Sequence, residues 1–235
     1  MAKKSRAVAH RRTQHPVIIA VVAVLVIAGA AVLLNRAGVI GPRGVAAEDL
    51  GRVLIVAASP DENGDVMGQI IMVADVTKSP AALAAVSPAT EVRIPGTTYS
   101  TLGDAYAFGG GEGTARALAQ IEGGEMLPYV AISSGELADA VAAAGGMRVT
   151  LPAAMSVFDG HDLFTFKEGP QTLSASRLQA VLKGAPYLAD DERDALDASL
   201  AEGLAGVLAS EPGTLRDALR TDLGPDALAR IAASL

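Results

Sequence analysis

The sequence contains no cysteine and no tryptophan, and aromatic residues account for only 3% of its 235 residues. The absence of cysteine excludes disulfides, thiol nucleophiles, and zinc or iron–sulfur centres with cysteine ligands. Half of the residues are hydrophobic, so any core must be built mainly from Ala, Val, Leu and Ile. A chain of this length provides for one domain with extensions, because a domain typically takes about 100–200 residues.

Acidic side chains are missing from the first fifteen residues. These residues contain five basic side chains, and the rest of the chain holds the other 14 basic residues with all 26 acidic ones, a net charge of −12. Binding to duplex nucleic acid requires a basic face that replaces the counterions of the phosphates. We therefore predict no nucleic-acid partner.

Charge of either sign is missing from residues 16–34, PVIIAVVAVLVIAGAAVLL. As a helix this segment would be about 28 Å long, close to the hydrocarbon thickness of a bilayer. A cleaved signal peptide is the alternative, but its apolar segment is usually about 7–15 residues long and is followed by small residues at the cleavage site. We predict an uncleaved transmembrane helix. The five cations before it, against Arg36 and Arg43 after it, place the N-terminus in the cytoplasm.

This topology divides the chain into five parts. We expect a cytoplasmic basic tail (1–15), a single helix across the cell membrane (16–34), and a linker containing Gly and Pro (35–50). An extracytoplasmic α/β domain follows (51–188). The C-terminal helices (189–235) are expected to pack on that domain or to extend it.

The α/β prediction comes from short apolar segments that alternate with turns and helical segments. Ser133 and Glu136 form a capping box at the start of one helix, which Gly145-Gly146 ends. The expected architecture is a mixed central sheet flanked by helices on both faces. The predicted strands are 52–58, 69–76, 82–88, 127–132 and 147–151, and the predicted helices are 136–145, 174–183, 189–210, 211–220 and 224–235.

Two loop motifs that suggest ligand binding are incomplete. The acidic loop 61–65 has Val66 and Met72 where a calcium loop needs a glycine and a carboxylate, so we interpret it as a solvated turn. Glycines 109–111 precede a helix that we expect to begin near Glu112. Such glycines can bind phosphate through their amides, but the Lys-Ser/Thr pair of a phosphate-binding loop does not follow.

Two isolated polar residues also lack the partners that a site requires. His161 is the only histidine beyond the first fifteen residues, and neither a G-x-S-x-G elbow nor a cluster with metal-ligand spacing accompanies it. We predict a surface histidine and no metal site. Arg93 stands alone in VSPATEVRIPG (86–96), and we interpret it as a solvated charge.

Four stretches, in this order, resemble the LytR-CpsA-Psr (LCP) family and together cover about residues 51–185. The first comprises the two strands VLIVAAS and IIMVADV, and the second is IPG followed by LGDAYAFGGGEGTARAL, similar to the family's N-A-A-Y-A-x-G-G entry into a helix. The third, YVAISSGELADAVAAAGGMRVTLPAAM, is similar to a strand, a helix, a GG-V-x-V strand and a P-x-x-M tail. The last, FKEGPQTLSASRLQAVL, is similar to L-x-x-G-x-Q-x-L-x-G-x-x-A-L.

The resemblance implies a membrane-anchored protein that attaches polymers carried on polyprenyl pyrophosphate to the cell wall. In this family a hydrophobic pocket holds the polyprenyl chain, and arginines and aspartates hold the pyrophosphate and usually a magnesium ion. The chemistry requires such groups, because a dianionic leaving group needs fixed positive charge and guanidinium groups bind phosphate in a bidentate manner.

This sequence departs from the family at the charged positions. Removing one phosphate-binding arginine commonly costs several kcal/mol of transition-state stabilisation, so we predict a degenerate, non-catalytic member that needs no cofactor. The departures are Ala57-Ala58-Ser59 for G-S-D, Met67-Gly68-Gln69 for S-D-T, Ala89 for the arginine of I-P-R-D, and Leu182-Lys183-Gly184 for R-x-R.

Three hypotheses of function follow, and the two without catalysis, the first and the third, are given together here. The first is a binding module for a polyprenyl phosphate or pyrophosphate lipid, or for another cell-wall assembly protein, with Tyr106, Phe108, Gly109 and Gly110 as candidate ligand-binding residues. It requires an apolar cavity near residues 102–118 if the ligand is a lipid. The third is a structural or regulatory envelope protein without a ligand.

The second hypothesis is an active phosphotransferase whose charged residues have moved. Its candidate catalytic residues are Arg93, Arg116, Lys183 and Asp61, and magnesium would be its cofactor. We prefer the non-catalytic interpretation because the expected charged positions are lost.

Overall fold

The computed structural model describes residues 50–61, 63–216 and 220–235. The predicted tail, the predicted transmembrane segment and nearly all of the predicted linker lie outside the described residues. Within the described part of the chain, no helix is both long enough and apolar enough to cross a membrane.

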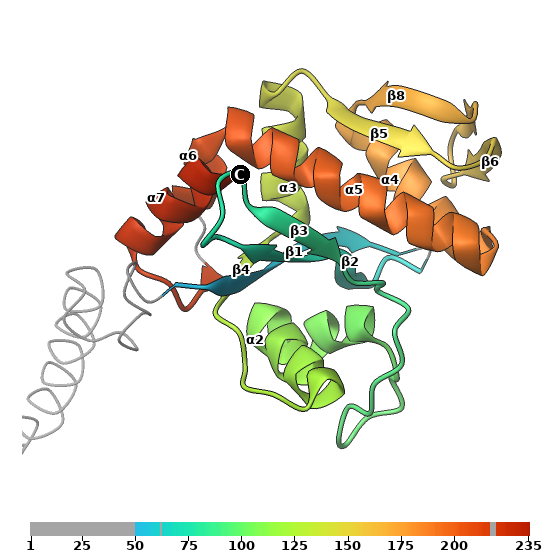
Figure 1. The fold of residues 1–235 in the computed structure, drawn as a ribbon. Coiled ribbons are helices and arrows are strands. Elements are labelled where there is room, and N and C mark those ends of the chain that lie inside the picture. The colour runs from blue at the N-terminus through green and yellow to red at the C-terminus, as the bar shows by residue number, and fades with distance from the viewer. Residues whose placement is uncertain (1–49, 62, 217–219) are drawn as a thin grey trace, which may run out of the picture. The chain divides into compact units, whose positions relative to one another are not determined.

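The centre of the domain is a mixed sheet, as predicted, and it has five strands in the described part of the chain. It contains β1 (Arg52–Pro60), β2 (Val66–Asp75), β3 (Ala82–Ala85), β4 (Tyr129–Ile132) and β9 (Arg220–Thr221), in the order β3-β2-β1-β4-β9 (Figure 1). The pair β1–β4 is parallel and the other pairs are antiparallel.

The two longest strands form a hairpin whose turn is the acidic loop 61–65. The β1–β2 register shifts between Ala57 and Ala58, where a bulge bends the strand. In the turn, one carboxylate oxygen of Asp61 accepts hydrogen bonds from the backbone N–H groups of Asn63 and Asp65, at 2.8 Å each. The carboxylate therefore stabilises the turn itself, in agreement with the predicted interpretation.

Helices cover both faces of the sheet. Helix α2 (Leu102–Glu122) lies on one face, and α3 (Ser134–Ala143), α4 (Ala175–Gly184) and α5 (Asp190–Ser210) lie on the other (Figure 1). Two hydrophobic cores result, a smaller one between the sheet and α2 and a larger one on the opposite face. The larger core includes side chains of α5 and α7 (Pro225–Ser234), so the C-terminal helices pack on the α/β domain.

Helix α2 begins at Leu102, earlier than the predicted start near Glu112, but it consists of two helical segments that meet at a kink at Gly110, and the second segment begins close to the predicted position. The side chain of Thr101 accepts from the backbone N–H of Asp104, whose carboxylate accepts in return from the N–H of Thr101. This capping box starts the helix ten residues early. The glycines lie inside α2 instead, and Gly110, with φ of 58° and ψ of −146°, interrupts it with a conformation that glycine tolerates.

The other helices begin and end close to their predicted limits. Helix α3 has the predicted capping box of Ser133 and Glu136. In α5, predicted over 189–210, four leucines at helical spacing form a stripe that is buried throughout (Leu196, Leu200, Leu204, Leu208).

The C-terminal helix expected over 211–220 is present in part. Pro212–Arg216 form α6, and Arg220 does not belong to a helix but pairs with Ala131 of β4. This pairing covers the edge of the central sheet, which would otherwise present unpaired backbone groups.

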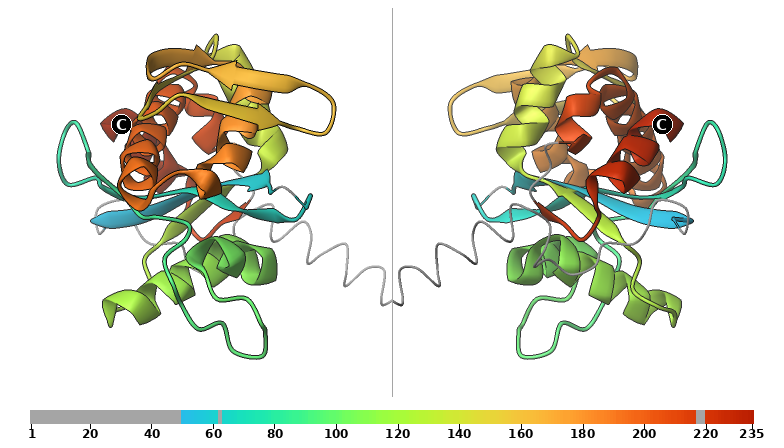
Figure 2. Two further views of the ribbon diagram at one scale, coloured as in Figure 1. Left: turned by 90° about the vertical axis from the view of Figure 1, so that its right-hand side faces the viewer. Right: turned by 90° about the vertical axis from the view of Figure 1, so that its left-hand side faces the viewer.

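Two small antiparallel pairs lie outside the central sheet. The predicted strand 147–151 is present as β5 (Met147–Leu151), but it pairs with β8 (Gly169–Leu173). Strands β6 (Met155–Phe158) and β7 (Leu163–Phe166) form a hairpin that the sequence did not predict. Figure 2 shows the loop before α2 on the α2 side of the sheet and the β5–β8 pair on the opposite side.

Candidate functional site

A cavity of about 310 Å³ lies where the β1–β2 turn, the start of β2, the entry to α2, the end of α4 and the first turns of α5 meet. We call it the Lys183 cavity. Among the residues that line it are Asp61, Gln69, Ala89, Lys183, Arg193 and Asp197.

The Lys183 cavity brings together three of the four stretches at which the sequence is predicted to depart from the family, and the fourth, Ala57-Ala58-Ser59, does not line it. Met67-Gly68-Gln69 from β2, Ala89 from the loop before α2, and Lys183 from α4 all line it, although up to 116 positions separate them along the chain. From the resemblance, several charged side chains are expected at these positions. Here they contribute one charge, the ammonium group of Lys183.

Two of the three carboxylates that line the cavity are engaged in local structure. Asp104 accepts from the backbone N–H groups of Ser100, at 3.1 Å, and Thr101, at 2.9 Å. Asp61 holds the β1–β2 turn through two backbone N–H groups. Their oxygens therefore position the loops around the cavity.

The cations of the cavity are Lys183 and Arg193. Nη2 of Arg193 donates to the backbone oxygen of Leu188 at 3.1 Å and lies 3.4 Å from a carboxylate oxygen of Asp190. Nε of Arg193 is buried and has no hydrogen-bond partner. The ammonium group of Lys183 makes no hydrogen bond or ion pair with the described residues. Lys183 also lines a neighbouring cavity with Asp159, whose pKa is lowered by backbone hydrogen bonds and, to a smaller extent, by the charge of Lys183.

Asp197 is the third carboxylate, and its side chain lies at the buried start of α5. The residue is only 9% exposed, and its Oδ2 atom has no hydrogen-bond partner. Burial raises the pKa of Asp197 to about 6, against the opposing effects of the Ser87 hydroxyl and of Arg193. At neutral pH the cavity wall therefore holds a carboxylate whose ionisation is costly.

Sequence reasoning missed both Arg193 and Asp197. Arg193 follows three acidic residues of a kind typical of a helix N-terminus, and that pattern indicates a helix start rather than a site. A signal for Asp197 was present, because this acidic residue adjoins the leucine stripe at Leu196, on the side of the helix that faces the core.

The residues around the cavity do not fit a magnesium site. Magnesium requires several oxygen ligands in near-octahedral geometry, whereas the oxygens of Asp61 and Asp104 already accept backbone hydrogen bonds. In the described part of the chain, no group of three or more His, Asp or Glu side chains is placed to hold a metal ion.

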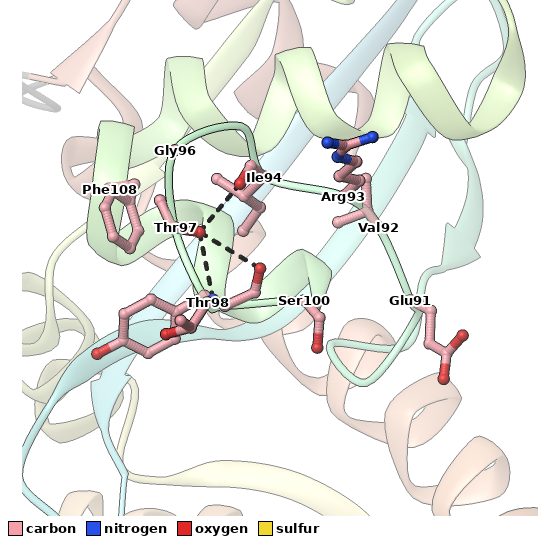
Figure 3. Close-up of a pocket in the computed structure, with 10 residues that line it drawn as sticks. Glu91, Val92, Arg93, Ile94, Gly96, Thr97, Thr98, Ser100 and Phe108 are labelled. Atoms are coloured by element: carbon pink, nitrogen blue, oxygen red, sulfur yellow. Dashed lines mark hydrogen bonds between the residues drawn. The ribbon is translucent and has the colours of Figure 1, made fainter.

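A second, more open cavity of about 1040 Å³ is formed by the loop 91–100 together with Phe108 of α2 (Figure 3). We call it the loop cavity. The rings of Tyr99 and Phe108 meet edge to face at 5.1 Å. The hydroxyl of Thr97 donates to the backbone oxygen of Ile94 at 3.0 Å and accepts from the N–H of Tyr99 at 3.2 Å. The polar groups of this loop thus bond to one another.

Arg93 lines the loop cavity and not the Lys183 cavity. Its side chain is exposed, and Figure 3 shows it at the opposite end of the loop from Phe108. Of the four candidate catalytic residues, only Asp61 and Lys183 share a cavity. Arg116 lies on the exposed face of α2, where its Nη2 donates to Glu112 at 2.6 Å.

The candidate ligand-binding residues of α2 also lie apart. Tyr106 is buried in the smaller core, and its hydroxyl accepts from Nη1 of Arg220 at 3.2 Å. Phe108 is half exposed and faces the loop cavity. Gly109 and Gly110 form the interruption of α2, and neither lines the Lys183 cavity or the loop cavity.

The second half of α2 lies directly on the sheet. A Cβ atom added at Gly111 would lie 2.5 Å from Cδ2 of Tyr129 and 2.8 Å from Cβ of Ala131, both in β4. The helix backbone therefore occupies the space in which a polyprenyl chain beneath this half of α2 would lie. The Lys183 cavity reaches α2 only at its first turn, at Gly103 and Asp104. The cavity near residues 102–118 that a lipid ligand was expected to require is therefore present only at this first turn, with room for a head group and not for the chain beneath the helix.

No protein-family model and no curated protein matches this sequence, but solved structures match the fold. TagT bound to LI-WTA is 17% identical and has a TM-score of 0.53, over 82% of this chain and 81% of that chain. B. subtilis TagV is 15% identical and has a TM-score of 0.52, over 78% of this chain and 80% of that chain. TagT is described as a LytR-CPS2A-psr family protein.

This chain has the LytR-CpsA-Psr fold. The LCP-like fold that the sequence resemblance predicted is therefore confirmed. At 15% and 17% identity the likeness shows the fold alone. The loss of the family's charged residues in this LCP-fold protein, and any consequence for activity, stays a prediction.

Proposed function

We propose that this LCP-fold protein is a non-catalytic binding protein of the cell envelope, which holds a polyprenyl-linked glycopolymer precursor by its phosphate end in the Lys183 cavity. One observation carries the proposal. The positions of Met67-Gly68-Gln69, Ala89 and Lys183 converge on one cavity, and Lys183 leaves an unpaired ammonium group there.

The chemistry of matching proteins supports the ligand class. TagT has been observed with LI-WTA, and also with octaprenyl pyrophosphate lipid. The Lys183 cavity has room for a head group, since ligand pockets commonly range from about 300 to 1,000 Å³, but not for a long chain as well. The polyprenyl chain of a bound precursor would therefore extend away from the cavity.

Electrostatics favours binding over transfer. Negative charge builds up on a departing pyrophosphate as its bond breaks, so transfer needs fixed positive charge that stabilises the transition state more than the ground state. In this cavity the two cations face three carboxylates, and the guanidinium groups of Arg93 and Arg116 lie elsewhere. Of the four candidate residues of the transferase alternative, only Lys183 and Asp61 lie in this cavity, and Asp61 already holds the β1–β2 turn.

The membrane location is part of the proposal and rests on the sequence. The apolar segment 16–34 would anchor the protein in the cell membrane with its domain outside the cytoplasm. In that position the cavity could receive a membrane lipid.

The test is binding and turnover of octaprenyl pyrophosphate by the full chain in phosphatidylcholine nanodiscs with magnesium. We expect saturable binding without release of phosphate. Lys183→Gln should weaken binding about tenfold or more, because a charge-assisted hydrogen bond is lost. Lys167→Gln, which neutralises an exposed lysine outside both cavities, should leave binding unchanged.

The other outcomes decide between the remaining functions. Turnover that both Lys183→Gln and Asp61→Asn abolish would show a transferase with moved charges. If the wild-type chain does not bind the lipid, the proposal fails, and the structural or regulatory interpretation replaces it.

A further inference from the structure

The cavity that Lys183 shares with Asp159 is a groove of about 560 Å³ beside the β6–β7 hairpin. We call it the hairpin groove. Across from β6 it is bounded by the end of α4 and by the short helix η2 (Ala185–Tyr187). It shares no residue with the loop cavity and only Lys183 with the Lys183 cavity. Its lining consists of residues 154–160, Lys183, Gly184, Tyr187 and Leu188.

Three large hydrophobic side chains at this groove are mostly exposed. Phe158, Leu163 and Tyr187 are 65%, 67% and 76% exposed, and the next large hydrophobic residue in the described part of the chain, Phe108, is 53% exposed. Phe158 and Tyr187 line the groove, and Leu163 lies opposite Phe158 in the hairpin. Because a hydrophobic side chain gains free energy when it is removed from water, such a cluster indicates a binding surface.

One edge of β6 has no partner strand. The N–H of Asp159 donates to the backbone oxygen of Asp162 at 3.1 Å, and hydrogen-bonded and non-hydrogen-bonded pairs alternate along an antiparallel ladder. Ser156 and Phe158 therefore belong to non-hydrogen-bonded pairs with β7, and their N–H and C=O groups point away from that strand. Among the described residues, neither finds a backbone partner on the other side.

These backbone groups face the hairpin groove. Consecutive residues from both faces of β6 line the groove, whereas no residue of β7 does, so the groove runs along the free edge. On the outer side of β7, the backbone oxygen of Thr165, which lies opposite Ser156, accepts from Nη2 of Arg177 at 3.3 Å. The outer edge of β7 is thus partly covered from within the protein, and the edge of β6 is the one open to a partner.

This combination of apolar rings and a free strand edge selects an extended peptide. A lipid chain would cover Phe158 and Tyr187 but leave the backbone groups beside them with neither water nor a partner, at a cost in free energy. A peptide that adds to β6 as a further strand pairs with those groups and places alternate side chains against the rings.

The charges around the groove favour a basic peptide. Asp159 lines the groove, and Asp162 is exposed beside it in the turn of the hairpin. The first turn of α5, which follows Leu188 in the chain, holds three more acidic residues. Lys183 is the only cation among the described residues that line the groove. Electrostatic complementarity therefore favours lysine or arginine side chains in the bound segment.

We propose that the hairpin groove binds a partner protein through an extended segment of apolar and basic residues, which adds to the free edge of β6. The backbone of the segment pairs with Ser156 and Phe158, and its apolar side chains meet the rings of Phe158 and Tyr187. Its cations lie near the acidic turn of the hairpin. This site is separate from the Lys183 cavity, so the inference does not rest on the proposed function.

The test uses the heptapeptide Lys-Val-Thr-Val-Thr-Val-Lys, fluorescently labelled, and the full chain in phosphatidylcholine nanodiscs. We expect saturable binding, measured by fluorescence anisotropy. Two further peptides carry N-methyl groups on alternate amides, one for each edge of the peptide strand. Methylation of the edge that meets β6 should weaken binding about tenfold or more, because it removes main-chain hydrogen bonds, and methylation of the other edge should leave binding unchanged. Replacing both lysines by glutamate should also weaken it.

Ser156→Pro tests the edge of β6 without breaking the hairpin. The N–H of Ser156 points to the groove and not to β7, so proline removes a donor for the peptide but no ladder bond, and binding should fall about tenfold or more. Thr165→Pro is the matched control, because it removes the outward N–H of the opposite residue, on the other edge, and it should leave binding unchanged. Phe158→Ala should weaken binding through the lost ring. The melting temperature of each variant checks that it is folded.

The inference is overturned if the wild-type chain does not bind the heptapeptide, or if neither methylated form binds more weakly, because binding would then not involve strand addition. Equal effects of Ser156→Pro and Thr165→Pro would also overturn it. If the wild-type chain instead forms dimers in nanodiscs that Ser156→Pro dissociates, a second copy of this chain occupies the groove and the proposed partner is wrong. Octaprenyl pyrophosphate binding through Lys183 is decided by its own experiment and is unaffected by these outcomes.

Discussion

The loop cavity and the Lys183 cavity differ in how they are built. The loop cavity is the larger, but nine of its ten lining residues belong to one continuous stretch, 91–100. The polar groups of that stretch bond to one another through Thr97. The Lys183 cavity is smaller and takes its walls from five parts of the chain. It alone includes residues with buried polar atoms that lack partners within the described structure, Arg193 and Asp197.

The difference shows that the volume of a cavity is a poor guide to the location of a binding site in this protein. A loop that satisfies its own polar groups gains little from a ligand. Polar groups that tertiary packing brings together and leaves without partners gain much more binding free energy when a ligand pairs with them. The single arginine of the loop cavity is therefore a weaker candidate than the single free lysine of the other.

The largest expected effect concerns the side of the membrane on which both cavities lie. Because the chain has no cysteine, a single introduced cysteine is the only thiol that a maleimide can label. We expect a membrane-impermeant maleimide to label Thr98→Cys, at the exposed rim of the loop cavity, in intact cells. Ser5→Cys, in the basic tail, should be labelled only after lysis. The reverse pattern would contradict the predicted topology.

The next effect compares the two cations directly. Lys183→Gln should weaken octaprenyl pyrophosphate binding by about tenfold to a hundredfold, the range for a lost charge-assisted hydrogen bond. Arg93→Gln should leave the dissociation constant unchanged, since that guanidinium is solvated in the loop cavity. Equal losses from the two variants, measured by calorimetry, would remove the distinction between the cavities.

A third prediction concerns the space beneath α2, where a lipid chain would need a further cavity. Gly111→Ala should lower the free energy of unfolding by about 1.5 kcal/mol, because its Cβ would meet Tyr129 and Ala131. Gly109→Ala is the control, since its Cβ would meet nothing within 4 Å. Urea denaturation measures both. If Gly111→Ala were as stable as the control, α2 would not lie closely on β4.

The smallest effect comes from the unpaired carboxylate of the Lys183 cavity. The folded-state pKa of Asp197, about 6, lies above the ordinary value of 3.8 for an aspartate, so the folded state holds the proton more tightly. Its stabilising contribution is present in full below pH 4 and is lost as the pH rises through 6. Charges that bear on this carboxylate are those of Asp194 and Arg193 in α5.

Asp197→Asn should therefore raise the free energy of unfolding at pH 7.5 by about 1 kcal/mol and flatten its dependence between pH 4 and 7. Glu91→Gln, an exposed carboxylate of the loop cavity, should do neither. Urea denaturation at several pH values measures both. A variant less stable than the wild type at pH 7.5 would show that the carboxylate is satisfied in the folded protein.

The sequence predicted the elements whose signals are local. The apolar segments of β1 and β2, the capping box at Ser133 and the leucine stripe of α5 each depend on residues within a few positions of one another. The early start of α2 was missed although its signal is also local. Thr101 and Asp104 form a capping box with Asp in place of the usual Glu or Gln.

The site was predictable only in part. The sequence, through its resemblance to the LCP family, identified Ala89 and Lys183 as positions of interest but could not show that they face one cavity. Arg193 and Asp197 belong to no motif, because what distinguishes them is burial without a complete set of hydrogen-bond partners, and that arises only on packing.

What the sequence determined by itself is therefore the apolar segment 16–34, the acidic character of the domain, and most of its strands and helices. Only the tertiary structure decided that Lys183 shares a cavity with Arg193 and Asp197 while Arg93 does not. The physical reason is that propensity and hydrophobic period act over a few residues. Burial and the absence of a hydrogen-bond partner arise only when distant segments pack together.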